Sequence, residues 1–276
     1  MPKTALVESG GGMAACYIAG VTYALAKHFR DFKPDIVIGA SGSSGTLSYY
    51  VAGQPESMKR IWLSLLSDKN FINPLRVWRV MNIDYLIDEV LKKQEPLNAE
   101  KIYQSDILYF IPSTNHRTGK LEYFSNRNGD DIFESMRASM ALPIAFNKYI
   151  KVKHKEYCDS YISASVHLNI EQALKLGADR IIVVSVEDAH PSKLVNLFYN
   201  FWLKHQSRKF LKNYHKEEKE SYVIPDSVEI IHISPKNNLE VGTFGNSKES
   251  LQKVFEQGYK DTVNNERLKS ILRVTQ

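Results

Sequence analysis

Cysteine is scarce in this chain: Cys16 and Cys158 are the only two among 276 residues. Two cysteines are too few for a disulfide framework, and neither belongs to a closely spaced set of cysteines or histidines of the kind that binds zinc. We therefore expect both thiols to be reduced and buried, and we expect no bound metal and no cofactor.

Long apolar runs are also absent. No stretch approaches the roughly 18 uninterrupted apolar residues of a membrane-spanning helix, and the opening letters MPKTALVES lack the basic and apolar regions of a signal peptide. The sequence therefore predicts a cytoplasmic protein, with at most peripheral contact with a membrane.

The formal charge of +5 favours anionic partners. Because no common nucleic-acid module is legible, nucleic acid is not expected among them.

Two strand-to-helix units are present near the start of the chain. Residues 4–9 (TALVES) have the pattern of a buried strand, and Ala14 to Phe29 that of an amphipathic helix. Residues 35–41 (DIVIGAS) repeat the strand, and small residues continue as a helix to about Gly53. This order predicts an α/β fold with a mainly parallel central sheet flanked by helices.

The rest of the chain alternates in the same way, without internal repeats or a clear domain boundary, so we expect one domain over residues 1–276. The expected helices are 56–93 with a break at 70–76, 130–142, a segment starting near 168, 194–220 and 247–272, and the expected strands are 106–113, 120–126, a hairpin over 149–160, a strand ending near 187, and 228–235.

The second strand ends in Gly39-Ala40-Ser41-Gly42-Ser43, which matches a G-x-S-x-G nucleophile elbow except for its fifth position. In such an elbow the flanking residues are small because the backbone turns sharply, and the third residue, here Ser41, is the nucleophile. Ser43 and Ser44 are rival candidates, but they fall inside the first helical turn. The same small residues are also compatible with tight packing alone.

The first strand is followed by three glycines, Gly10, Gly11 and Gly12, and by Met13. Backbone N–H groups at such a turn can bind an oxyanion or a phosphate. Residues 10–15 also fit the dinucleotide fingerprint G-x-G-x-x-A, but that motif expects an acidic residue after the second strand, where this chain has Ala40 and Ser41. Close packing of helix on strand is a third explanation. None of the eight histidines stands where a Ser-His-Asp triad would place it.

Taken in order, the strings ESGGGM, GASGS, RASMALPIAF, YCDSYIS and QALKLGADRIIVVSV resemble the patatin-like phospholipase family, over about Thr4 to Val186. The resemblance implies a three-layer α/β fold and hydrolysis of phospholipid or lysophospholipid esters by a Ser-Asp dyad without histidine. It assigns Ser41 as the nucleophile and Asp159 as the base, the oxyanion hole to residues 10–13, and a supporting wall of the site to residues 138–143.

Three departures from the family pattern are visible. Ser160-Tyr161 stand where the family usually has Gly-Gly after the aspartate, Ala14-Ala15 follow the glycines, and Ser165 to His167 replace the usual Asn-x-Pro. Bulk beside Asp159 could move its carboxylate away from Ser41, and a shift of about 1 Å can cost about a hundredfold in rate. The alternative hypothesis is therefore a catalytically impaired lipid-binding or regulatory protein on the same fold.

A basic amphipathic segment lies at about 190–222. Its pattern is compatible with a helix that contacts an anionic membrane through residues 192–216, although such a helix more often packs on its own core. The residues concerned are Leu194, Leu197, Phe198, Phe201, Trp202 and Phe210 with Lys204, Arg208, Lys209, Lys212 and Lys216.

Overall fold

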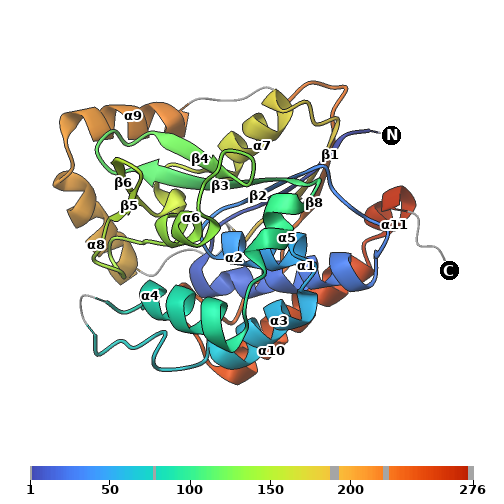
Figure 1. The fold of residues 1–276 in the computed structure, drawn as a ribbon, viewed down its shortest axis with the longest axis horizontal. Coiled ribbons are helices and arrows are strands. Elements are labelled where there is room, and N and C mark those ends of the chain that lie inside the picture. Colours follow the sequence, from blue (N-terminus) through green and yellow to red (C-terminus); the bar gives the residue numbers. More distant parts are fainter. Residues whose placement is uncertain (1, 77–78, 187–192, 220–223, 273–276) are drawn as a thin grey trace.

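The computed structural model describes residues 2–76, 79–186, 193–219 and 224–272. The strands form one sheet in the order β5-β6-β3-β2-β1-β7-β8, with β4 paired to β3 (Figure 1). Strands β3, β2, β1, β7 and β8 run parallel, whereas β4, β5 and β6 pair antiparallel. The strand bounds are β1 Thr4–Glu8, β2 Ile36–Gly39, β3 Leu108–Asn115, β4 Leu121–Ser125, β5 Ile150–Val152, β6 Lys155–Cys158, β7 Arg180–Val184 and β8 Glu229–Ile233.

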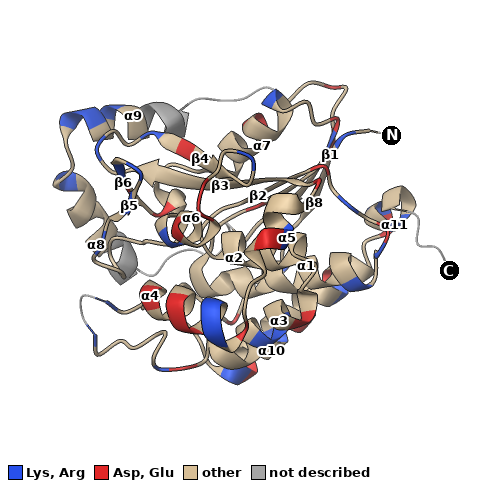
Figure 2. Ribbon diagram, in the orientation of Figure 1, with Lys and Arg blue, Asp and Glu red and all other residues tan. Residues whose placement is uncertain are grey.

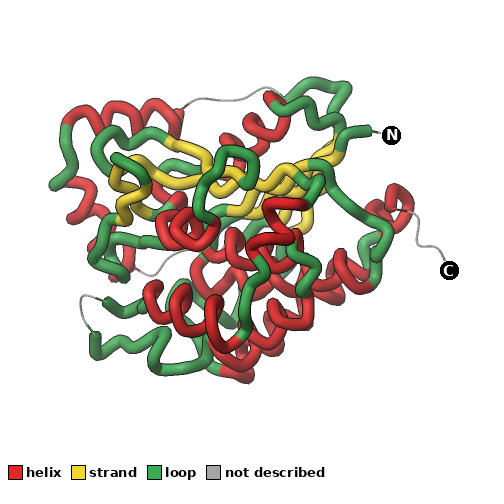
Figure 3. The backbone as a smooth tube through the Cα atoms, viewed as in Figure 1, coloured by secondary structure: helices red, strands yellow, loops and turns green. Residues whose placement is uncertain are grey.

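Helices cover both faces of the sheet, which confirms the expected three-layer α/β architecture (Figures 1 and 3). Side chains of β1 alternate between the layers: Ala5 and Val7 pack with α7, and Leu6 packs into the larger core on the other face. The helices are α1 Cys16–Lys27, α2 Gly42–Val51, α3 Pro55–Arg60, α4 Ile83–Tyr85, α5 Ala99–Gln104, α6 Ile132–Ser139, α7 Val166–Lys175, α8 Lys193–Lys204, α9 Arg208–Lys219, α10 Lys248–Val263 and α11 Glu266–Leu272. Two π-helical segments, η2 (Ile61–Leu65) and η3 (Leu86–Gln94), continue α3 and α4, and η1 (Gly12–Ala15) and η4 (Ser160–Ile162) are short 3₁₀ turns.

Two stretches expected as single helices are each divided in two. The segment 194–220 breaks between α8 and α9, where the Ser207 hydroxyl accepts the N–H of Phe210 at 3.1 Å and so caps a new helix. The closing stretch 247–272 breaks after α10, and the Asn265 side chain accepts the N–H of Leu268 at 3.0 Å to start α11. In both places a polar residue with a short side chain competes with continuation of the helix.

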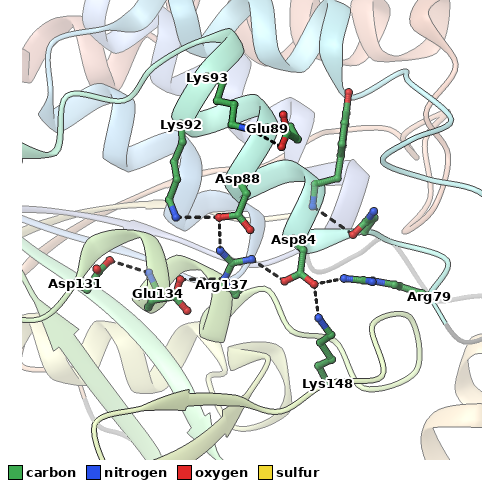
Figure 4. A network of polar contacts seen from close by, with 12 residues as sticks. Arg79, Asp84, Asp88, Glu89, Lys92, Lys93, Asp131, Glu134, Arg137 and Lys148 are labelled. Carbon is green, nitrogen blue, oxygen red and sulfur yellow. Dashed lines mark hydrogen bonds and ion pairs between the residues drawn. The ribbon is translucent and has the colours of Figure 1, made fainter.

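A network of charged side chains joins α4 and η3 to α6 (Figure 4). The Arg137 guanidinium donates to Asp84, Asp88 and Glu134, and Asp84 also pairs with Arg79 and Lys148. The hydrogen bond from Arg137 lowers the pKa of the Asp88 carboxyl to about 2. Ile83 and Leu86 line the cavity described below, so this network connects one wall of that cavity to α6, which ends at Ser139.

Candidate active site

The turn after β2 has the geometry of a nucleophile elbow. Ser41 lies between β2 and α2 with φ 49° and ψ −124°, a conformation that side-chain-bearing residues rarely adopt. Gly39 is required because a Cβ there would lie 2.7 Å from the Leu47 side chain and 2.9 Å from the Ser43 carbonyl oxygen. The helix can therefore fold back over the strand end only with glycine at this position.

Ser41 and Asp159 meet at this turn, although they are 118 residues apart in sequence. The Ser41 hydroxyl donates to Asp159 Oδ2 at 3.0 Å. Ser41 is 8% exposed and Asp159 is 2% exposed, so the hydrogen bond is shielded from bulk water. A hydroxyl paired with a buried carboxylate in this way can lose its proton directly to that carboxylate.

Backbone contacts hold Asp159 at the end of β6. Its N–H donates to the Ala141 carbonyl at 2.9 Å, and its Oδ1 accepts the N–H of Tyr161 at 2.7 Å. Burial raises the pKa of the Asp159 carboxyl to about 7, although hydrogen bonds from the Tyr161 amide and the Ser41 hydroxyl act in the opposite direction. A carboxylate with a pKa near neutrality is a far better base than a free one.

The residues that depart from the family pattern do not push Asp159 away. Ser160 is fully buried, and its hydroxyl accepts the N–H of Ser41 at 2.9 Å. Tyr161 meets Asp159 through its backbone, while its side chain is 52% exposed at the edge of the cavity. The added bulk is therefore accommodated with the hydrogen bond between Ser41 and Asp159 in place.

The glycine turn lies directly beside the elbow, since a Cβ on Gly10 would be 3.4 Å from Ser41 Cβ. The N–H groups of Gly10, Gly11 and Gly12 have no hydrogen-bond partner among the described residues. Gly12 has φ +56°, and a Cβ there would be 2.7 Å from the Thr243 carbonyl oxygen.

The fourth member expected in the oxyanion hole is already engaged. The Met13 N–H donates to the Thr243 carbonyl at 3.1 Å, because the segment before α10 lies against the turn. The Met13 amide is therefore not a free donor, and Thr243 is a supporting residue that sequence reasoning missed. No local pattern links it to residues 230 positions earlier.

The rival serines have structural contacts. The Ser43 hydroxyl donates to the Ser9 carbonyl at 2.7 Å, and the Ser44 hydroxyl donates to the Ser41 carbonyl at 2.6 Å. Both residues are fully buried, and neither lines the cavity. Ser43, at the fifth elbow position, thus ties the elbow to the glycine turn.

A cavity of about 430 Å³ opens from Ser41 and Asp159 into the protein interior. The glycine turn and the elbow form one end of the cavity, and the other end lies between α2 and the π-helical segments η2 and η3. Tyr199 of α8 and Tyr214 of α9 also contribute to it. The apolar residues that line it include Met58, Ile61, Trp62, Leu66, Phe71, Met81, Ile83, Leu86, Leu91, Met140, Leu142 and Ile144.

Fold and site together define an α/β protein with a serine elbow and an aspartate beside an apolar cavity. The family model described as patatin-like phospholipase matches residues 6–173, and the chain belongs to this family, which points to the lipid acyl hydrolases as a class. A second model, described as a domain of unknown function, matches residues 207–273.

Individual relatives share little sequence identity with this chain. The uncharacterized protein YjjU of Escherichia coli (strain K12) is 26% identical over 192 residues, which cover 66% of this chain and 51% of YjjU. The chain thus spans about half the length of this curated relative. The crystal structure of VipD from Legionella pneumophila matches 98% of this chain and 67% of VipD, with a TM-score of 0.54 and 15% identity, a likeness that bears on the fold alone. The match to the crystal structure of the type III effector protein ExoU covers 98% of this chain and 54% of the ExoU chain, with a TM-score of 0.45 and 12% identity.

Proposed function

We propose that this protein hydrolyses carboxylic esters of phospholipid or lysophospholipid, with Ser41 as nucleophile and Asp159 as general base. The observation that carries the proposal is the 3.0 Å hydrogen bond from the Ser41 hydroxyl to Asp159 Oδ2 at the mouth of an apolar cavity. Apolar walls suit an acyl chain, and the polar end of the cavity is where the ester carbonyl would lie.

In the proposed mechanism, Ser41 Oγ attacks the ester carbonyl carbon while its proton passes to Asp159 Oδ2. The negative charge that develops on the carbonyl oxygen is stabilised by amide N–H groups of Gly10, Gly11 and Gly12. The C–O bond to the alcohol breaks, and the alcohol leaves with the proton from Asp159. Asp159 then takes a proton from water as the water oxygen attacks the acyl-enzyme carbonyl carbon. The bond from that carbon to Ser41 Oγ breaks, Asp159 returns the proton to Ser41 Oγ, and the fatty acid is released.

The alternative of a catalytically impaired lipid-binding protein depended on a displaced Asp159. Because Ser160 and Tyr161 leave the hydrogen bond between Ser41 and Asp159 intact, no specific observation favours that alternative. The use of the glycine turn for a nucleotide also has less support, because Gly10 lies beside the elbow serine and the adjoining cavity is mainly apolar.

We expect a fluorophosphonate probe to label the native protein at Ser41, and we expect fatty acid to be released from phosphatidylcholine or lysophosphatidylcholine. Ser41→Ala should abolish both, because among the described residues it is the Ser41 hydroxyl that donates to the Asp159 carboxylate. Ser44→Ala is the matched control, since this neighbouring buried serine only donates to a carbonyl. Labelling that persists in Ser41→Ala, or a native protein that releases no acid from any ester, would refute the proposal.

Peripheral contact with an anionic membrane through residues 192–216 is part of the proposal. Trp202 and Phe210 pack inward, with Phe210 fully buried, whereas Leu197, Phe198 and Phe201 are 65%, 54% and 64% exposed on α8. Residue 192 lies outside the described residues, as do the side chains of Leu194 and Lys216. No helix in the described part of the chain is long and apolar enough to cross a membrane.

Charge on the same side of the molecule favours anionic lipid. Figure 2 shows basic residues on α9 and around its junction with α8. The residues Lys204, Arg208, Lys209 and Lys212 are exposed, and none of them forms an ion pair with another described residue. Tyr199 of the same helix lines the cavity, so a membrane bound at α8 would lie close to the cavity.

The double variant Phe198→Ser/Phe201→Ser is expected to reduce binding to phosphatidylglycerol-containing vesicles by at least about tenfold, because apolar burial and charge attraction act together at an interface. Cosedimentation measures the bound fraction, and higher salt should weaken binding by the native protein. Lys209→Glu should also weaken binding, while Lys101→Glu, an exposed lysine on α5, should not. Binding that is indifferent to anionic lipid, to salt and to the two phenylalanines would remove the membrane proposal.

A further inference from the structure

Two buried hydroxyl groups meet the backbone N–H of Ser41. Ser139 Oγ lies 3.0 Å from this nitrogen and Ser160 Oγ lies 2.9 Å from it, so one N–H is shared between two acceptors. Ser139, the last residue of α6, and Ser160, the residue after Asp159, are both fully buried. Neither lines the cavity, so neither can touch a bound acyl chain.

The protons of these hydroxyls are also accounted for. Ser139 Oγ donates to Ser160 Oγ at 3.2 Å, and Ser160 Oγ donates to the Ser139 carbonyl at 3.4 Å. Both oxygens therefore face the Ser41 N–H as acceptors, and no buried hydroxyl proton is left unpaired. A buried polar cluster that is fully satisfied in this way is rigid and specific in geometry.

The Ser139 and Ser160 hydroxyls bind the part of the elbow where the backbone is strained. The φ of 49° at Ser41 is strained, and such a conformation persists only when its surroundings hold it in place. Residue 41 is bound to two consecutive residues, through its hydroxyl to Asp159 and through its N–H to Ser160. Glycine, which the family usually has at position 160, could not make the second contact.

We propose that Ser139 and Ser160 are positioning residues that hold the Ser41 backbone so that its hydroxyl stays within hydrogen-bond reach of Asp159. This inference rests on the proposed function. Ser160, whose bulk on sequence alone is expected to disturb catalysis, instead supports catalysis by holding the Ser41 backbone.

The test is a double-mutant cycle on the full chain with a short soluble ester, p-nitrophenyl butyrate. Ser139→Ala and Ser160→Ala each leave one acceptor for the Ser41 N–H, so each should lower kcat less than tenfold. The double variant leaves the N–H buried and unpaired, and kcat should fall at least about a hundredfold with KM unchanged, as expected when a reacting atom is misplaced by about 1 Å. Ser135→Ala is the matched control, because its buried hydroxyl, one turn earlier on α6, only bonds the Asp131 carbonyl.

Hydrogen exchange at the Ser41 amide provides a readout that does not need activity. Exchange should be slow in the native protein and in Ser135→Ala, faster in each single variant, and fastest in the double variant. Additive effects on kcat, a change confined to KM, or equal exchange in all variants would overturn the inference. If the native protein hydrolyses no ester, the proposed function fails and exchange alone decides the positioning role; if the double variant does not fold, exchange in the two single variants decides it.

Discussion

Asp159→Asn is expected to lower kcat/KM for ester hydrolysis by about 10²- to 10⁴-fold, the range that a positioned general base contributes. Asparagine has nearly the shape of aspartate, so its Oδ1 can still accept the Tyr161 N–H and the elbow keeps its support. What it cannot do is take the proton from the Ser41 hydroxyl. The change therefore removes a step of the reaction and leaves the site otherwise in place.

The same variant is expected to be more stable than the native protein at pH 8. The pKa of Asp159 is about 7 in the folded protein, above the ordinary value of 3.8. The folded state therefore holds this proton more tightly than the unfolded state does, and its contribution to stability is present at low pH and lost as pH rises through about 7. Asparagine is neutral at every pH, so the variant avoids that loss.

Thermal unfolding at pH 5 and pH 8 measures the stability difference, which should grow with pH. The native kcat/KM should rise with pH and reach half its plateau near pH 7, because only ionised Asp159 can act as a base. Asp130→Asn is the control: this buried carboxylate pairs with Lys153 and accepts the Ser125 N–H, so its loss should cost stability and leave kcat/KM unchanged. An Asp159→Asn protein that retains a tenth of native activity, or that is less stable at pH 8, would contradict the assignment.

The elbow could be found from sequence because its signal is local. A buried strand, a run of small residues and a helix follow one another within residues 35–53, and each part has its own pattern. The partner of Ser41 has no such signal. Asp159 stands in an ordinary hairpin, and only its place in the order of family motifs selects it from the other acidic residues.

Long-range contacts explain what sequence reasoning missed. The Thr243 carbonyl that engages Met13 comes from a loop far along the chain, and no propensity predicts that the two meet. Ser160 was visible as a departure from glycine, but its contact with the Ser41 N–H depends on how the turn after β6 packs against the elbow. By contrast, the break at Ser207 had a signal, since serine is a preferred residue at the start of a helix.

Residues 207–273 match a separate family model, yet β8 pairs with β7 and α10 packs against α1. These contacts support our proposal that the chain is one structural domain. They also place the loop before α10 against the glycine turn, through Thr243. The C-terminal part of the chain therefore bears directly on the shape of the candidate site.

Gly258→Ala is expected to destabilise the protein by about 3 kcal/mol or more, the upper range for overpacking a tightly packed interface. Helices α1 and α10 cross with glycines at the contact: a Cβ on Gly258 would lie 2.1 Å from the Tyr17 carbonyl oxygen, and one on Gly20 would lie 2.0 Å from the Phe255 carbonyl oxygen. Both obstacles are backbone atoms, which cannot rotate away. Since alanine normally stabilises a helix by about 1 kcal/mol over glycine, the sign of the effect is itself diagnostic.

Urea unfolding of Gly258→Ala, Gly20→Ala and a control measures this effect. Gly45→Ala is the matched control, because Gly45 is also helical and a Cβ there would meet only the flexible Met140 methyl group, at 3.1 Å. We expect that change to be tolerated within about 1 kcal/mol. If both interface variants were as stable as Gly45→Ala, α10 could not pack against α1 as it does in the structure. The contact between the loop before α10 and the glycine turn would then also be wrong.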